Sequence, residues 1–126
     1  MSKAGLKVIK NSMSSLGLNY KFMEWKGEPM YPYFIGEYQE TPPLNEDGML
    51  ETTFILTGFS RCSWDQLEEA KQHIENHFNK VGGKTVKTES GSVVAVFYSN
   101  SLVVPTGDAE LKKIQINLII KEWSVN

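Results

Sequence analysis

Apolar residues near the start of the chain recur at the spacing of an amphipathic helix. Leu6, Ile9, Met13 and Leu16 are three or four positions apart, which places them on one face of a helix. This pattern predicts a helix over residues 4–16. We expect it to end at Gly17, because glycine is common just past a helix end.

A second and clearer helix pattern begins at Ser63 and is predicted to span residues 63–81. Its apolar stripe consists of Trp64, Leu67, Ala70, Ile74, Phe78 and Val81. Ser63 can cap the first turn, and Gln66 three positions later completes a capping-box pattern. The Gly82-Gly83 pair is expected to stop the helix.

Alternating and β-branched apolar runs predict strands in the rest of the chain. The predicted strands span residues 20–27, 33–40, 51–59, 85–90, 93–105 and 111–124. The last strand has the cleanest pattern, since isoleucines and a leucine at even positions alternate with mostly polar odd positions. Such alternation is typical of an antiparallel strand with one wet face. Loops are expected at 28–32 and 42–48, where prolines and the Asp47-Gly48 turn dipeptide occur.

The predicted element order is α-β-β-β-α-β-β-β. It contains no strand–helix–strand repeat with glycine-rich turns, so a doubly wound parallel sheet is not expected. We predict an α+β fold in which two helices pack on one face of a mostly antiparallel sheet. The length of 126 residues fits a single domain covering residues 1–126.

Composition narrows the classes of partner. The chain has 13 basic and 15 acidic residues and a formal net charge of −2, which does not favour nucleic-acid binding through bulk electrostatics. Arg61 is the only arginine, and sequence-specific DNA readers usually depend on arginine. Cys62 is the only cysteine and has no intramolecular partner for a disulfide. With no apolar run of about 18 residues and no signal-peptide pattern, we expect no membrane association and a cytoplasmic site of synthesis.

Two features point weakly to catalysis or metal binding. His73 and His77 are four positions apart on the second predicted helix, a spacing at which two imidazoles can share a metal ion. The metalloprotease pattern is not met, however, because Ile74 stands where that pattern has glutamate. Cys62 lies just before the same helix, where its thiolate would be favoured. We expect no catalytic residue, metal or cofactor, and a small metal-dependent or cysteine-dependent enzyme remains the alternative.

The segment YPYFIGEYQE, residues 31–40, concentrates aromatic and acidic side chains. Its tyrosines Tyr31, Tyr33 and Tyr38 can act as amphipathic anchors at a contact with another chain. Glu37 and Glu40 begin an acidic run that continues through Glu46, Asp47 and Glu51. This run indicates a negative surface facing a partner. A pocket formed by the three tyrosines would instead indicate a small-molecule-binding module.

A second candidate contact lies on the last predicted strand. Ile119 and Trp123 occupy odd positions beside Lys121, on the face that is otherwise polar. An apolar pair on a wet face indicates a further buried surface, such as a subunit contact.

The order and texture of these segments resemble a known family over nearly the whole chain. A short helix and a strand precede PYFIGEYQE; an acidic, proline-containing loop leads to ETTFILTGFS; the helix SWDQLEEAKQHIENHF follows, and a β-hairpin closes with INLIIKEW. This arrangement is similar to the tail terminator, or tail completion, proteins of long-tailed bacteriophages and prophages.

The resemblance implies a non-enzymatic structural subunit without a cofactor. Members of that family form closed rings, usually hexamers, on the last ring of the tail tube. The ring stops tube growth and offers a docking face to head completion proteins, while DNA passes through its lumen without specific binding. The expected location is the tail or neck of the virion, and the host cytoplasm during assembly. Other head–tail connector proteins share this size and texture and remain the nearest alternative.

A ring requires two different patches on each subunit, because its contacts are head to tail. The candidate interface residues are Tyr31, Tyr33, Glu37, Tyr38, Glu40, Ile119 and Trp123. A weakly acidic chain with few arginines also suits a lumen through which DNA must slide.

Overall fold

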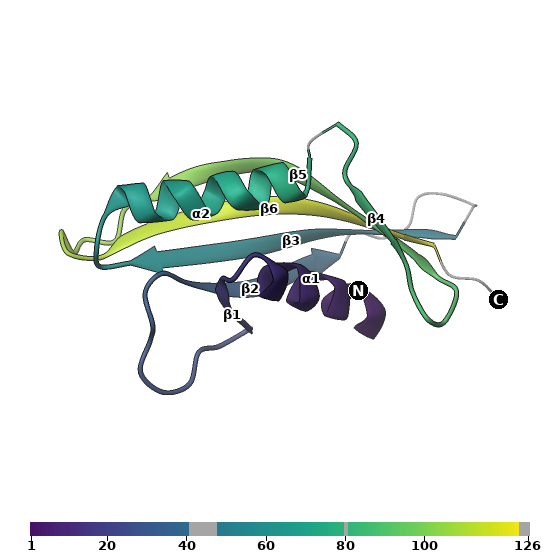
Figure 1. Ribbon diagram of the computed structural model, residues 1–126, viewed down its shortest axis with the longest axis horizontal. Helices are drawn as coiled ribbons and strands as arrows, with labels where there is room; N and C mark the ends of the chain where they lie inside the picture. The colour runs from purple at the N-terminus through teal and green to yellow at the C-terminus, as the bar shows by residue number, and fades with distance from the viewer. Residues whose placement is uncertain (41–47, 80, 124–126) are drawn as a thin grey trace.

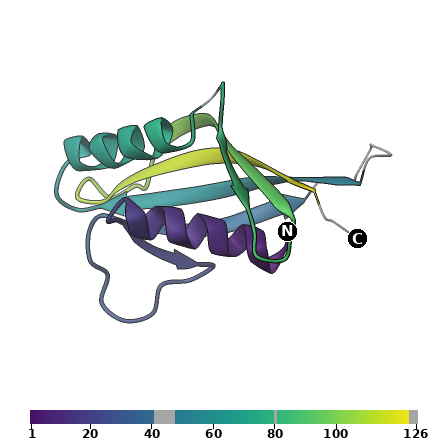
Figure 2. The same ribbon diagram turned by 45° about the vertical axis from the view of Figure 1, so that its right-hand side comes forward.

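The computed structural model of the chain describes residues 1–40, 48–79 and 81–123. Within these ranges, two helices cover one face of a six-stranded sheet (Figures 1 and 2). The elements are α1 (Lys3–Ser15), β1 (Asn19–Phe22), β2 (Tyr33–Glu40), β3 (Met49–Ser60), α2 (Trp64–His77), β4 (Lys84–Lys87), β5 (Val93–Val104) and β6 (Lys112–Trp123). The predicted α+β class and element order are confirmed.

The strand order across the sheet is β1-β2-β3-β6-β5-β4. The long strands β3 and β6 lie in the centre and pair antiparallel from Met49 opposite Trp123 to Ser60 opposite Lys112. The pairing of β1 with β2 is parallel, and the other pairings are antiparallel. The predicted mostly antiparallel sheet is therefore confirmed.

The core lies between the helices and one face of the sheet. The even positions of β6 from Ile114 to Ile120 are fully or almost fully buried, as are Phe54 and Leu56 on β3. The helices contribute their own buried residues to this core: Val8, Ile9, Met13, Leu67, Ala70 and Ile74. Burial of such apolar side chains supplies most of the driving force for the fold.

Glycine allows the closest approach of β2 to β3. Gly58 lies opposite Phe34 in the register of these strands. A Cβ atom at Gly58 would come within 2.4 Å of Phe34 Cε1, so the buried ring occupies the space that any larger residue would need.

Several predicted elements are longer than the observed ones, and two of the differences change where side chains lie. The strand predicted at 20–27 ends at Phe22, because Met23 adopts a left-handed conformation with φ of 70°, which does not continue a strand. The helix predicted at 63–81 ends at His77, and Phe78 caps it. Val81 is therefore 91% exposed rather than part of the apolar stripe, and Trp64 at the other end is 41% exposed.

The predicted capping box at the start of α2 is half right. The Ser63 hydroxyl accepts a hydrogen bond of 3.2 Å from the backbone N–H of Gln66, as the pattern predicts. The Gln66 side chain does not return to Ser63, however, and instead accepts a 2.6 Å hydrogen bond from Ser60 Oγ. This bond ties the end of β3 to the first turn of the helix.

Some predictions concern residues outside the described ranges. The loop expected at 42–48, apart from Gly48, lies outside these ranges, and so do the acids Glu46 and Asp47. Neither helix in the described part of the chain has the length and apolarity that crossing a membrane requires.

Candidate functional site

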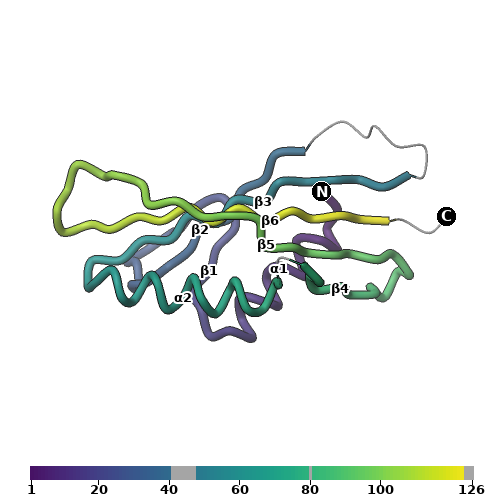
Figure 3. Tube along the Cα trace, turned by 90° about the horizontal axis from the view of Figure 1, so that it is seen from above, coloured from purple at the N-terminus to yellow at the C-terminus, as the bar shows by residue number. Residues whose placement is uncertain are grey.

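One face of the sheet lies opposite both helices (Figure 3). The odd positions of β3 and β6 point to this side, because neighbouring residues of a strand face opposite ways. From Glu51 to Phe59 and from Lys113 to Trp123, these odd positions are only half-buried, whereas most even positions are buried. We call the side chains of β2, β3, β5 and β6 on this side the uncovered face.

The predicted pair Ile119 and Trp123 lies on the uncovered face. Ile119 has Thr53 and Phe97 as its cross-strand neighbours. Lys121 lies between the pair on the same strand, and its Nζ atom is 5.8 Å from the centroid of the Phe97 ring. A cation at this distance is attracted by the ring. This end of the face therefore combines apolar and cationic groups.

Trp123 has Met49 and Val93 as its neighbours across the sheet. Its side chain is half-buried. The apolar surface around Ile119 thus continues to the end of β6.

An aromatic cluster occupies the opposite end of the uncovered face. It consists of Trp25, Tyr31, Tyr33 and Phe59. Tyr33 is at its centre, with ring centroids 5.1 Å from Trp25, 5.4 Å from Tyr31 and 5.0 Å from Phe59. Such aromatic pairs stabilise a folded protein by more than the burial of their apolar area alone provides. Desolvation by these neighbours raises the pKa of the Tyr33 phenol, and the nearby Tyr31 adds to this effect.

Two cations border the aromatic cluster. Lys113 Nζ is 5.6 Å from the centroid of Phe59, and Arg61 lies 6.0 Å from the centroid of Tyr31. Arg61 Nε also donates a 3.2 Å hydrogen bond to Tyr31 Oη, and its guanidinium lies 3.4 Å from Asp108. The Glu110 backbone N–H, more than Arg61, holds the pKa of Asp108 below its usual value. These contacts fix Tyr31, which precedes the cis peptide bond to Pro32.

The predicted residues of β2 divide between the two faces of the sheet. Glu37 pairs with Ile55 and lies on the uncovered face, as Tyr33 does. Tyr38 pairs with the buried Phe54 and stacks on Phe22 at 6.0 Å, so it lies on the helix side. Glu40 lies on that side too, where it forms an ion pair with the amino group of Met1.

The alternative of a pocket formed by three tyrosines is therefore wrong. Tyr33 and Tyr38 are an odd number of positions apart on β2, so their rings point to opposite faces. The sequence placed them together because they are close along the chain, but the pleat of the strand separates them.

The histidines and the cysteine do not form one site. His73 Nε2 lies 3.8 Å from Glu69, on an exposed part of α2. His77 Nε2 is buried and has no hydrogen-bond partner among the described residues. The His77 side chain lines a groove of about 280 Å³ together with residues of α1, Lys84 and Val86. Burial lowers the pKa of this imidazole, and the charge of Lys84 lowers it further.

Cys62 is exposed and precedes α2, whereas both histidines lie in the second half of that helix. At 1.5 Å per residue, even His73 is roughly 13 Å along the helix axis from Trp64, the first residue of α2. No group of three histidine, cysteine, aspartate or glutamate side chains placed to hold a metal occurs in residues 1–40, 48–79 and 81–123.

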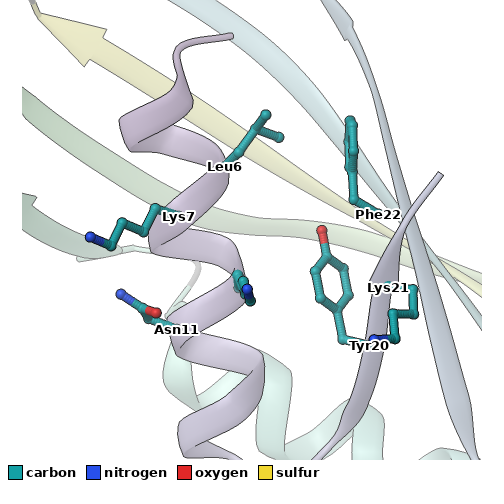
Figure 4. Close-up of a pocket in the computed structure, with 7 residues that line it drawn as sticks. Leu6, Lys7, Asn11, Tyr20, Lys21 and Phe22 are labelled. Carbon is teal, nitrogen blue, oxygen red and sulfur yellow. The ribbon is translucent and has the colours of Figure 1, made fainter.

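A groove of about 530 Å³ separates α1 from β1 (Figure 4). Leu6 on the helix and Tyr20 and Phe22 on the strand line it, and so do Lys7, Lys10, Asn11 and Lys21. Lys7 and Asn11 point away from β1 in Figure 4. Burial raises the pKa of the Tyr20 phenol. The lining is mainly apolar and carries no arrangement of groups that indicates a reaction.

The sequence patterns missed part of the aromatic cluster. Trp25 was expected within a strand, but it lies in the loop after β1, where its Nε1 donates a 3.2 Å hydrogen bond to the Glu28 carbonyl. Phe59 was assigned to the third strand without a role. Its odd position is the signal that places it with Thr57 and Ile55 on the uncovered face.

Comparisons of the sequence with protein-family models and with curated proteins give no match. The likeness to tail terminator proteins therefore remains an expectation from the order of the sequence segments.

Proposed function

We propose that this chain is a structural protein of a long-tailed bacteriophage or prophage, and that it forms the tail terminator ring. In this proposal, the ring caps the tail tube and docks it to the head, and DNA passes through its lumen without specific contacts. The chain needs no cofactor and catalyses no reaction. It acts in the tail or neck of the virion, after assembly in the bacterial cytoplasm.

The observation that carries this proposal is the uncovered face. A six-stranded sheet has one face packed under two helices, while the other presents aromatic and aliphatic side chains at both of its ends. Partly accessible clusters of apolar side chains on a sheet face opposite the helices indicate contact with another chain. Trp, Tyr and Arg are also the residue types most enriched in the strongest parts of protein interfaces, and Trp25, Tyr33 and Arg61 lie together here.

The first test asks whether the chain assembles. Native mass spectrometry and negative-stain electron microscopy of the purified protein should show closed rings of one size. Added to a polymerising tail tube protein, the chain should sit at tube ends and shorten the tubes. Binding to isolated head portals without binding to tube ends would favour a different head–tail connector instead.

A matched pair of variants tests the role of the uncovered face. Ile119→Asp places a charge among the apolar residues at one end of this face and should abolish rings and tube capping, since an unpaired charge is costly in an interface. Val81→Asp is the control, because Val81 is an exposed apolar residue off the sheet. Rings formed equally by both variants would count against the uncovered face as a contact.

A further inference from the structure

The sheet has a free backbone edge on each side. β1 pairs only with Tyr33–Gly36 of β2, so no strand in the described part of the chain pairs with Glu37–Glu40 on that side. At the opposite side, β4 is the last strand in the sheet order. Free strand edges are templates for pairing with another chain, so the molecule offers two such templates.

These two edges carry opposite charge. The β2 edge bears Glu37 and Glu40, and all four of its residues are exposed. The β4 edge bears Lys84 and Lys87, which are exposed as well. Apart from the Met1 amino group on Glu40, no ion pair in the described part of the chain engages these four side chains.

A third lysine extends the basic side. A groove of about 360 Å³ lies between α1 and the β4–β5 hairpin, and both Lys7 and Lys87 line it. Figure 2 shows the turn of this hairpin beside the first part of α1. Glu89 is the one acid that lines the groove, so the groove has a net positive lining.

The acidic and basic edges share one row of the sheet, and the two segments extend from it in opposite directions along the strands. One row of paired residues crosses the sheet from Glu40 through Thr52, Ile120 and Val96 to Lys84. By strand alternation, Glu40 and Lys84 belong to the helix side of the sheet, whereas Glu37 belongs to the uncovered side. In a second copy of the same orientation, shifted by two residues along the strands, Gln39 would lie opposite Thr85. Glu40 would then lie diagonally opposite Lys84, within reach of its long side chain.

We propose that a second copy of this chain docks the Glu37–Glu40 edge of its β2 on the Lys84–Lys87 edge of β4. The contact continues the sheet from one subunit to the next, as in strand addition. It is head to tail, so repetition of it gives a ring when the rotation between neighbouring subunits closes. This inference rests on the proposed function and names a second contact, besides the uncovered face, between neighbouring subunits of the ring.

Charge reversal tests the proposal. The variants Lys84→Glu/Lys87→Glu and Glu37→Lys/Glu40→Lys should each need a roughly tenfold or higher concentration to assemble, because like charges then face each other. An equimolar mixture of the two should assemble again, since each mismatched edge then finds its opposite in the other variant. Added salt should weaken wild-type assembly.

Three controls keep these results interpretable. Lys26→Glu/Lys112→Glu makes the same change in charge away from both edges and should assemble as wild type. Glu37→Lys alone leaves the ion pair of Glu40 with Met1 intact and should still impair assembly. Circular dichroism of each variant checks that the fold persists.

A disulfide cross-link tests the contact directly. In a Cys62→Ser background, Gln39→Cys and Thr85→Cys should form ladders of linked subunits on oxidation when both are present in one chain. Either cysteine alone should not form ladders, because the contact joins two different edges. Cross-linking requires Cα atoms within about 7 Å, which makes it a measure of proximity.

The outcomes separate this inference from the function on which it rests. The edge contact would be overturned if both charge-reversed variants formed rings normally. It would also be overturned if the chain with both cysteines formed rings but no disulfide-linked ladders. Either result would leave the ring proposal standing. A wild-type chain that stays monomeric at all concentrations and does not cap tail tubes would contradict both.

Discussion

The rings of Tyr33 and Phe59 stack across β2 and β3, with centroids 5.0 Å apart and planes inclined by 23°. The two residues are directly opposite in the strand register, on the face that no helix covers. The pair anchors the aromatic cluster on the uncovered face.

The stacking of this pair should be measurable as a coupling free energy. We expect a double-mutant cycle of Tyr33→Ala and Phe59→Ala to give about 1 kcal/mol, which is typical of aromatic pairs. Urea denaturation of the four proteins provides the free energies of unfolding. Additive effects of the two substitutions would show that the rings do not stabilise each other.

Substitution of Gly58 should destabilise the fold. Gly58→Ala places a methyl group against the Phe34 ring, within 2.4 Å of Cε1. Overpacking of this kind typically costs about 1–3 kcal/mol of unfolding free energy. Gly82→Ala is the matched control, because a Cβ at Gly82 meets nothing within 4 Å. Equal thermal midpoints for the two variants would contradict the close packing of β2 on β3.

Substitutions of two isoleucines of β6 are expected to have different effects, one mainly on stability and the other mainly on assembly. Ile116 is fully buried under the helices, so Ile116→Ala should lower the free energy of unfolding by about 2–5 kcal/mol. Ile119 is half-buried on the uncovered face, so Ile119→Ala should cost about 1 kcal/mol or less while weakening ring formation. Chemical denaturation of the monomer and native mass spectrometry measure the two effects. Intact rings from Ile119→Ala would argue against the uncovered face as a contact.

Stability should depend on pH through His77. Burial, reinforced by Lys84, lowers the pKa of this imidazole below its ordinary value of 6.5. The unfolded chain therefore binds the proton at a higher pH than the folded chain. The stabilisation from the neutral imidazole is complete above about pH 6.5 and is lost as the pH falls below that value towards the lower folded pKa.

Urea midpoints at pH 8 and pH 5.5 measure this effect. The midpoint should fall between these values in the wild type, and the fall should be smaller in His77→Gln. His73→Gln, on the same helix, is the matched control. A pH dependence that is identical in His77→Gln and the wild type would show that another group is responsible.

Local sequence patterns predicted most secondary structure because they depend on near neighbours. The alternation in β6 and the stripe in α2 correctly indicated which residues are buried, since each periodicity fixes one face of its element. The errors occurred at element ends. Met23 stops β1 through its backbone conformation, and Phe78 caps α2 three positions before the apolar stripe runs out.

The candidate site was only partly visible in the sequence. Ile119 and Trp123 were placed correctly on one side of the last strand, because period-two alternation decides this from the sequence itself. The role of Trp25 and Phe59 beside Tyr33 was not visible, since these residues come from three separate segments.

The sequence by itself determined the class of fold, the order of the elements and the faces of the longest strands, all of which follow from periodicity over a few residues. Only the tertiary structure decided which strands are neighbours. The order β1-β2-β3-β6-β5-β4 places acidic Glu40 and basic Lys84 at opposite ends of one row. Strand pairing joins residues far apart in the chain through backbone hydrogen bonds that are alike for every sequence, so local patterns do not reveal it.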